Sequence, residues 1–363
     1  MTGVAAAAAA GDLAGDAVGA VVAAAVPAAA GGPAAGRADG LLSGADIRAI
    51  AGALDLRPTK KRGQNFLVDP NTVRRLVRLA GIGPDDVVLE VGPGLGSLTL
   101  GLLGAARRVV AVEVDPALAA ALPATAAARL GPAGAARLTV LTRDALSLGP
   151  ADLAAAPQPG TGEPVTGELG TGELGTEPGT GTEEPAGTDP ARTVEPPGVL
   201  AANLPYNIAV PLLLGLLERV PSLQRGLVMV QAEVADRLTS PPGGRVYGVP
   251  SVKLAWYAEA RSAGPVPRTV FWPVPNVDSG LVAFRRRPAP APESMRADVF
   301  AAVDAAFAQR RKTLRTALAG WAGSPVAVEE IARAADVDPG ARGETLDVAA
   351  YCRLAAARAA RLA

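Results

Sequence analysis

The 363-residue chain is long enough for two domains, or for one large domain with an appendage. Its 35 basic and 35 acidic residues balance, and the lack of histidine excludes imidazole base catalysis and histidine-ligated metal sites. The single cysteine, Cys352, excludes an intrachain disulfide framework and a multi-cysteine zinc site, so we expect no metal and a small buried thiol. These properties fit a cytoplasmic enzyme.

The first 42 residues are dominated by alanine and glycine. A secretory signal needs a basic start, but the first basic residue is Arg37. A membrane span needs about 20 strongly apolar residues, whereas Asp12 and Asp16 interrupt this stretch. We therefore predict that residues 1–42 form a disordered or weakly helical tail with no role in the chemistry, and that the protein has no membrane partner.

Strand and helix patterns alternate after this tail. Near-continuous apolar runs predict buried strands at residues 86–91, 108–114, 137–142, 198–203 and 226–231. Helical patterns follow four of them, beginning near Ser97, at the Asp115-Pro116 cap, near Val210 and at Ala232. Repeated strand–helix units of this kind predict a parallel sheet covered by helices on both faces. Beyond Pro292 the pattern is purely helical, which predicts a small C-terminal helical domain.

Residues 157–197 interrupt the alternation with near-repeats of Thr-Gly-Glu, many Pro and Gly, and no aromatic residue. Such a segment cannot bury enough apolar area to offset its ordering entropy, so we predict a disordered acidic insertion. Without residues 1–45 and 151–198, the chain holds 33 basic and 23 acidic residues. That excess of about ten positive charges fits a polyanionic partner.

Polar or glycine residues stand where four predicted strands end. Gly92 and Gly94 follow the first strand and allow close backbone approach to a ligand, although an ordinary tight turn is the alternative. The Gly-x-Gly-x-Gly spacing disfavours a dinucleotide fingerprint. Glu113 ends the second strand, where a carboxylate can accept both ribose hydroxyls of a nucleoside. Asp144 ends the third and can receive an adenine amino group, and Asn203 ends the fourth. Ligands of open α/β sheets bind at these strand ends, so we predict a nucleoside site here.

In this order, the motifs resemble those of S-adenosylmethionine-dependent methyltransferases that act on the exocyclic amine of adenine. Three further stretches, residues 60–69, 271–282 and 306–318, resemble signatures of the ribosomal RNA adenine dimethyltransferases, specifically the small-subunit (KsgA/RsmA) type. The resemblance covers roughly residues 45–156 and 198–358. The departures are the long tail, the acidic insertion and several small residues where larger ones are expected.

The resemblance implies a Rossmann-like, seven-stranded methyltransferase sheet whose last strand is antiparallel. It implies a catalytic domain over residues 43–290 and a helical rRNA-binding domain over residues 291–363. The implied cofactor is S-adenosyl-L-methionine. The implied reaction is N6,N6-dimethylation of two adjacent adenosines in the 3′-terminal hairpin loop of 16S rRNA, within a small ribosomal subunit or its precursor. We expect the enzyme to act as a monomer in the cytoplasm.

The Asn203-Leu-Pro-Tyr206 turn has a physical reading in this reaction. An exocyclic adenine amine is a poor nucleophile because its lone pair is delocalised into the ring. The Asn203 side-chain oxygen and the Leu204 carbonyl can accept its two N–H groups, while Pro205 fixes the turn. Tyr206 offers a face on which a flipped base can stack, and the resemblance implies that Phe271 closes the other side. A purely structural turn is the alternative.

The stretch before the first strand is basic and polar. By resemblance, Asn65 and Leu67 touch the cofactor. Lys60, Lys61 and Arg62 could meet phosphates, although such a triplet is also typical of a solvated face.

A second basic cluster lies in the C-terminal region. We predict that Arg311 and Arg315 lie four residues apart on one helix face, with Arg310 and Lys312 beside them. Basic clusters on a helix can bind a phosphate backbone without reading sequence, and a solubilising face is the alternative.

Three other functions remain open. One is methylation of large-subunit rRNA of the macrolide-resistance type. The glycine before Gln64-Asn65 and the Arg-Arg-Lys-Thr-Leu-Arg stretch favour the small-subunit type instead. A non-catalytic RNA-binding assembly factor on the same fold has no need of Glu113, Asp144 and Asn203. A small-molecule N-methyltransferase has no need of a basic C-terminal domain.

Overall fold

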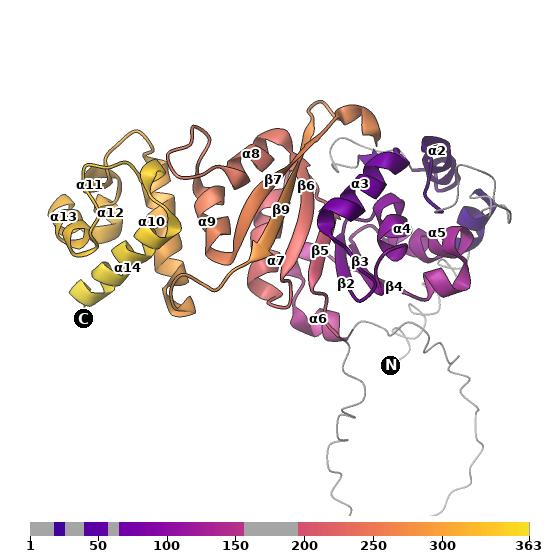
Figure 1. The fold of residues 1–363 in the computed structure, drawn as a ribbon, viewed down its shortest axis with the longest axis horizontal. Helices are drawn as coiled ribbons and strands as arrows, with labels where there is room; N and C mark the ends of the chain where they lie inside the picture. Colours follow the sequence, from indigo (N-terminus) through magenta and orange to yellow (C-terminus); the bar gives the residue numbers. More distant parts are fainter. Residues whose placement is uncertain (1–17, 26–39, 57–64, 156–194, 363) are drawn as a thin grey trace, which may run out of the picture.

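The computed structural model describes residues 18–25, 40–56, 65–155 and 195–362. A twisted sheet with helices against it forms the larger part, and the C-terminal helices pack at one end of it (Figure 1). The basic triplet Lys60, Lys61 and Arg62 lies outside the described residues, as does the predicted insertion up to residue 194. No helix of the described ranges is long and apolar enough to cross a membrane.

The central sheet has seven strands in the order β4-β3-β2-β5-β6-β9-β7. Their bounds are β2 Val87–Val91, β3 Arg108–Glu113, β4 Leu138–Thr142, β5 Val199–Asn203, β6 Arg225–Gln231, β7 Ala258–Val266 and β9 Ser279–Arg286. The first five of these pair in parallel, whereas β9 is antiparallel to both of its neighbours. The expected parallel sheet with an antiparallel last strand is confirmed.

Apolar side chains on both faces of the sheet explain why these segments are strands. All five residues of β2 are buried, and alternate ones join different cores. Leu89 packs in the core with Leu200 and Leu213, and Val88 packs in the opposite core with Leu102. A β-strand sends successive side chains to opposite faces, so both faces of the sheet are covered.

Helices connect the strands. Those of the sheet region are α2 Gly44–Ala53, α3 Pro70–Ala80, α4 Ser97–Leu103, α5 Pro116–Ala135, α6 Pro150–Ala154, α7 Ala209–Arg219, α8 Ala232–Thr239 and α9 Val249–Tyr257. The Asp115 carboxylate caps α5 by accepting the N–H groups of Ala117 and Leu118, and proline follows it, as predicted. A separate two-stranded sheet pairs β1 Phe66–Leu67 antiparallel to β8 Phe271–Trp272.

The C-terminal region is helical, as predicted. Its helices are α10 Arg296–Ala308, α11 Leu314–Ala317, α12 Ala319–Ala322, α13 Pro325–Ala334 and α14 Val348–Leu362, with a 3-10 turn, η6, at Gly343–Thr345. Tyr351 of α14 belongs to the same buried cluster as Trp256 of α9. Arg296 also links the regions, because it donates to the Tyr257 hydroxyl over 2.9 Å and forms an ion pair with Glu218 of α7.

Of the two alternatives predicted for the tail, the helical one applies to residues 18–25, and the predicted end at residue 42 falls within a stretch that is ordered from residue 40. Residues 18–25 form a helix, and its Val22 is fully buried in the core that contains Leu118 and Ala121 of α5. Leu42 is also buried in that core. Alanine favours helix, and valine and leucine here find an apolar surface to cover.

The end of the predicted insertion is also ordered. The Glu195 carboxylate forms an ion pair with Arg107, and the buried Pro197 accepts the Ser222 hydroxyl over 2.8 Å through its carbonyl. The predicted boundary at residue 197 is therefore too late by at least three residues, since these contacts tie residues 195–197 to the sheet region.

Candidate functional site

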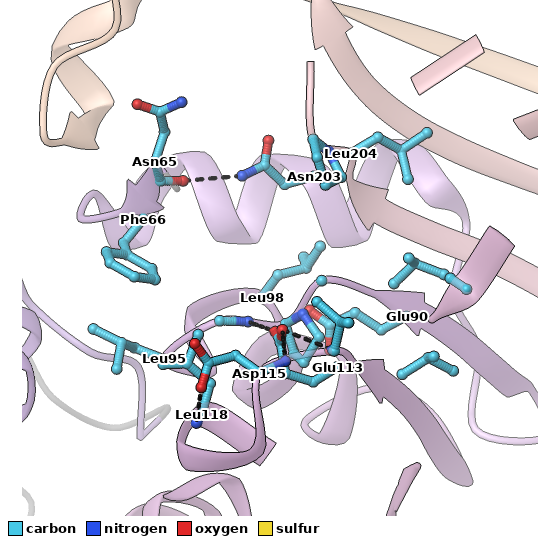
Figure 2. Close-up of a pocket in the computed structure, with 18 of the residues that line it drawn as sticks. Asn65, Phe66, Glu90, Leu95, Leu98, Glu113, Asp115, Leu118, Asn203 and Leu204 are labelled. Carbon is cyan, nitrogen blue, oxygen red and sulfur yellow. Dashed lines mark hydrogen bonds between the residues drawn. The ribbon is translucent and has the colours of Figure 1, made fainter. Parts of the chain in front are cut away.

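A cavity of about 490 Å³ lies at the carboxyl ends of β2, β3, β4 and β5 (Figure 2). Ten of the residues proposed from sequence line it: Asn65, Leu67, Gly92, Gly94, Glu113, Asp144, Asn203, Leu204, Pro205 and Tyr206. The first two come from the segment around β1, and the other eight follow or end the four strands. The structure therefore brings the predicted strand-end groups into one site.

The turn after β2 requires glycine at two points. Gly92 and Gly94 have φ angles of +67° and +58°, a region that L side chains rarely adopt. A Cβ on Gly94 would also lie 2.9 Å from the Phe66 ring, which covers this turn. A side chain at either position would therefore be strained, and one at position 94 would also meet Phe66, which itself lines the cavity.

Glu113 is anchored by the backbone around it. One carboxylate oxygen accepts the N–H groups of Val114 and Asp115 over 2.9 and 3.1 Å, and the other accepts Gly94 N–H over 3.1 Å. Burial raises the pKa of Glu113, and these backbone hydrogen bonds oppose that rise. A carboxylate offers about four acceptor sites, so roughly one remains for a ligand hydroxyl. To accept both ribose hydroxyls, the carboxylate must lose one of its three backbone hydrogen bonds.

Glu90 lines the cavity, and it lies within the strand predicted at residues 86–91, where no role was assigned to it. Its side chain is 1% exposed, and its Oε2 has no hydrogen-bond partner among the described residues. Burial, together with the nearby Glu113 carboxylate, raises its pKa to about 8. An unsatisfied buried acceptor costs about 1–3 kcal/mol, so this oxygen suits a donor on a bound ligand. An acidic residue within an apolar strand was the signal that could have revealed it.

Asp144 stands at the end of β4. Its Oδ1 accepts the N–H of Leu146 over 2.9 Å and so caps the 3-10 turn η2 (Ala145–Ser147). The neighbouring Arg143 also lines the cavity and forms an ion pair with Asp152 of α6. These contacts fix the cavity wall next to the end of β3.

Asn203 is oriented by a residue far away in the chain. Its Nδ2 donates to the backbone carbonyl of Asn65 over 3.1 Å (Figure 2). Because the amide nitrogen is engaged there, the Oδ1 atom of this cavity-lining residue remains as an acceptor. The next residue, Leu204, is 1% exposed, and its N–H donates to the Met229 carbonyl over 3.0 Å. The turn therefore presents one side-chain acceptor from a fixed backbone.

Tyr206 is held by a second residue that the sequence reasoning did not assign. Its hydroxyl lies 2.7 Å from the Oγ of Ser279, a fully buried residue at the start of β9. Burial raises the pKa of Tyr206, so the phenol stays neutral at physiological pH. Ser279 lies within the quoted 271–282 stretch, but only the folded sheet brings it to the turn after β5.

Phe271, which the resemblance places on the other side of the flipped base from Tyr206, is not brought to the cavity by the structure. Phe271 is 1% exposed, faces Leu67 across the two-stranded sheet, and is not among the lining residues. It packs in the core with Val266 instead. Phe66 is the aromatic residue that lines the cavity on the β1 side, and its ring stacks with that of Trp272 at 6.3 Å.

The C-terminal basic cluster also differs from the prediction. The helix α10 ends at Ala308, residues 309–312 form a turn, and Arg315 belongs to the separate helix α11. Arg311 and Arg315 therefore do not share one helix face. In the turn beyond the helix, the Arg310 side chain contacts Glu344 and the Arg245 carbonyl.

Comparisons with known proteins show to which proteins the chain is similar. A family model described as "Ribosomal RNA adenine dimethylase" matches residues 56–356. "Ribosomal RNA small subunit methyltransferase A" of Kineococcus radiotolerans is 58% identical over 318 residues, which cover 88% of this chain and 92% of that protein. The protein of the same name from Thermobifida fusca is 56% identical over 315 residues, or 87% and 95% of the two chains.

Two solved structures share the fold. A dimethyladenosine transferase from Plasmodium falciparum matches with a TM-score of 0.55 at 18% identity, over 80% of this chain and 95% of that one. The 23S rRNA methyltransferase ErmE matches with a TM-score of 0.52 at 24% identity, over 81% and 99%.

Proposed function

The chain belongs to the ribosomal RNA adenine dimethylase family, and we propose that it dimethylates N6 of two adjacent adenosines in the 3′-terminal hairpin loop of 16S rRNA. The substrate is then a small ribosomal subunit or its precursor. The enzyme acts as a monomer in the cytoplasm, with S-adenosyl-L-methionine as the methyl donor.

The orientation of Asn203 carries this proposal. With Nδ2 committed to the Asn65 carbonyl, Oδ1 is available to accept one N–H of the target amine. The backbone carbonyl of Leu204, a buried residue of the same turn, accepts the other N–H group. Two acceptors on the two N–H groups leave the nitrogen lone pair as the remaining reactive direction. Pro205 keeps the turn in this shape by fixing its own φ angle.

The residues of the cavity fit the cofactor. S-adenosyl-L-methionine supplies a methyl group on a positively charged sulfur. Gly92 and Gly94 give it a backbone surface without side chains, and Glu113 has an acceptor site for a ribose hydroxyl. Asp144 receives the adenine amino group, Asn65 and Leu67 cover the ligand, and the unsatisfied Glu90 oxygen accepts a further donor.

The transfer needs no histidine. Positioning the amine against the methyl donor removes most of the entropic barrier, and the nitrogen loses its proton after the bond has formed. Tyr206 stacks on the flipped base, and Ser279 keeps its ring in place. Asn203 and Leu204 therefore bind the amine of the target base, and Tyr206 binds its ring.

RNA contacts come from the basic residues outside the cavity. Arg311 and Lys312 are exposed and have no ion pair within the described residues. Arg315 is partly neutralised by Glu329, and Arg310 is tied to Glu344. We assign the phosphate contacts mainly to Arg311 and Lys312, while a phosphate contact of Lys60, Lys61 and Arg62 stays a prediction from the sequence.

Primer extension on small-subunit rRNA tests the proposal. A strain that lacks this protein should lose the stop at two adjacent dimethyladenosines near the 3′ end, and expression of the wild-type protein should restore it. Expression of the Asn203→Ala variant should not restore it. An unchanged stop in the deletion strain, or a lost stop on large-subunit rRNA, would overturn the assignment.

A further inference from the structure

The Arg310 side chain is engaged in contacts within the protein, unlike an arginine that is free to bind phosphate. Its Nε donates to the Glu344 carboxylate over 2.6 Å, and its Nη2 donates to the backbone carbonyl of Arg245 over 2.8 Å. Arg245 lies in the loop between α8 and α9, and Glu344 lies in η6. One side chain thus connects the turn after α10 with two segments that are distant in the sequence.

Further bonds join the same segments. The N–H of Gly243 donates to the Glu344 carbonyl over 2.7 Å, and the Tyr247 hydroxyl donates to the Leu346 carbonyl over 2.9 Å. The Tyr247 ring packs against Phe307 of α10, with centroids 6.1 Å apart. In Figure 1 the loop after α8 extends from the sheet region toward the C-terminal helices. The loop and the turn are therefore held against each other across the two regions.

Three cations stand free around this junction. Arg245, Arg311 and Lys312 are exposed, and the described residues offer none of them an ion pair. We infer that Arg310 and Glu344 form a clamp that joins Arg245 to Arg311 and Lys312 in one RNA-phosphate-binding surface spanning the two regions. This inference rests on the proposed function for its RNA partner. It reassigns Arg310 from phosphate contact to positioning, and it adds Arg245, which lies 66 residues before Arg311 in the chain.

The clamp has a physical reason. An exposed loop that binds RNA alone loses conformational entropy when it becomes ordered, which weakens binding. A loop already held by a charged hydrogen bond loses less. The guanidinium suits this task because its fork can donate to a carboxylate and a carbonyl at once, whereas a lysine ammonium is a point charge.

For the Glu344→Gln variant, the clamp and a simple effect of charge predict opposite changes in RNA affinity. If charge alone governed binding, removing an acidic residue would tighten binding to RNA. Loss of the clamp should instead weaken binding to undermethylated small subunits by about threefold for each phosphate contact that is lost. Arg310→Lys keeps the charge and should weaken binding in the same direction. Arg245→Ala should lower the slope of log affinity against log salt by roughly 0.7–0.9. In a protein that already carries Glu344→Gln, Arg245→Ala should cause little further loss of affinity.

Arg333→Ala is the matched control, because Arg333 is an exposed arginine of α13 outside this surface. Its salt slope should stay within error of the wild type, and thermal melts should show that every variant is folded. A wild-type slope for Arg245→Ala, or binding of Glu344→Gln as tight as wild type or tighter, would overturn the inference. If wild-type protein binds subunits in this salt-dependent way but transfers no methyl group, the proposed function fails and the surface stands.

Discussion

Glu113 in the cavity is 6% exposed and accepts three backbone N–H groups, whereas Arg245, Arg311 and Lys312 extend into solvent beside a single ion-pair clamp. The cavity groups are therefore fixed by local backbone next to each strand end. The basic surface depends on contacts between distant segments. Buried groups interact strongly because water screens them little, while exposed cations act through charge and respond to salt. Substitutions in the cavity should change the chemical step, and substitutions on the surface should change binding.

Asn203→Ala should give the largest effect. It removes the acceptor for the target amine, so methyl transfer should fall by about a hundredfold or more. Affinity for S-adenosyl-L-methionine should stay within about tenfold of the wild type, because the substitution leaves the glycine turn and Glu113 intact. Single-turnover methylation and calorimetric titration of the cofactor separate the two quantities. Near-wild-type turnover would contradict the role given to Asn203.

Gly94→Ala should weaken the cofactor site and the fold together. The alanine must adopt the left-handed backbone conformation of Gly94, which costs roughly 1–2 kcal/mol. Its Cβ would also lie 2.9 Å from the Phe66 ring. Gly52→Ala in α2 is the matched control, since among the described residues no atom outside its own helix backbone and chain neighbours lies within 4 Å of its Cβ position, and alanine favours helix. Urea unfolding should show Gly94→Ala destabilised and Gly52→Ala unchanged or stabilised. Equal behaviour of the two variants would mean that the turn tolerates a side chain.

The pH dependence of stability should report on Glu90. Its folded pKa of about 8 lies above the ordinary glutamate value of 4.5, so between these pH values the folded state holds a proton that the unfolded chain releases. That contribution is complete below about pH 4.5 and is lost as pH rises through about 8. Glu90→Gln cannot titrate, so its melting temperature should gain on the wild type between pH 5 and pH 8 without cofactor. A constant difference between the two proteins would show that Glu90 is already ionised in the fold.

Apolar strand runs and the position of polar residues at their ends predicted most of the cavity from sequence. The edge strand β7 was missed because its sequence, AEARSAGPV, contains no apolar run. Only the two end residues of the strand are buried, and a bulge at Ser262/Gly264 interrupts its pairing. The turn at residues 309–312 was mistaken for helix because local periodicity continues through it. The burial of Phe271 was not predicted either, since it depends on the tertiary pairing with Leu67.

Deletion of residues 157–194 should have the smallest effect. After the deletion Glu195 still pairs with Arg107, which directly precedes the amino end of β3, while the cavity lies at the carboxyl ends. Strands of five or six residues separate these ends by about 17–20 Å. The other attachment point follows α6, whose Asp152 pairs with the cavity residue Arg143, so the replacement linker must leave that ion pair intact. A short Gly-Ser linker meets this need, and each halving of loop length changes the closure free energy by only about 0.6 kcal/mol.

Methyl incorporation into undermethylated subunits and the melting temperature should both stay close to wild type. If turnover collapsed while the melting temperature held, the segment would have a role at the cavity that its attachment points do not reveal.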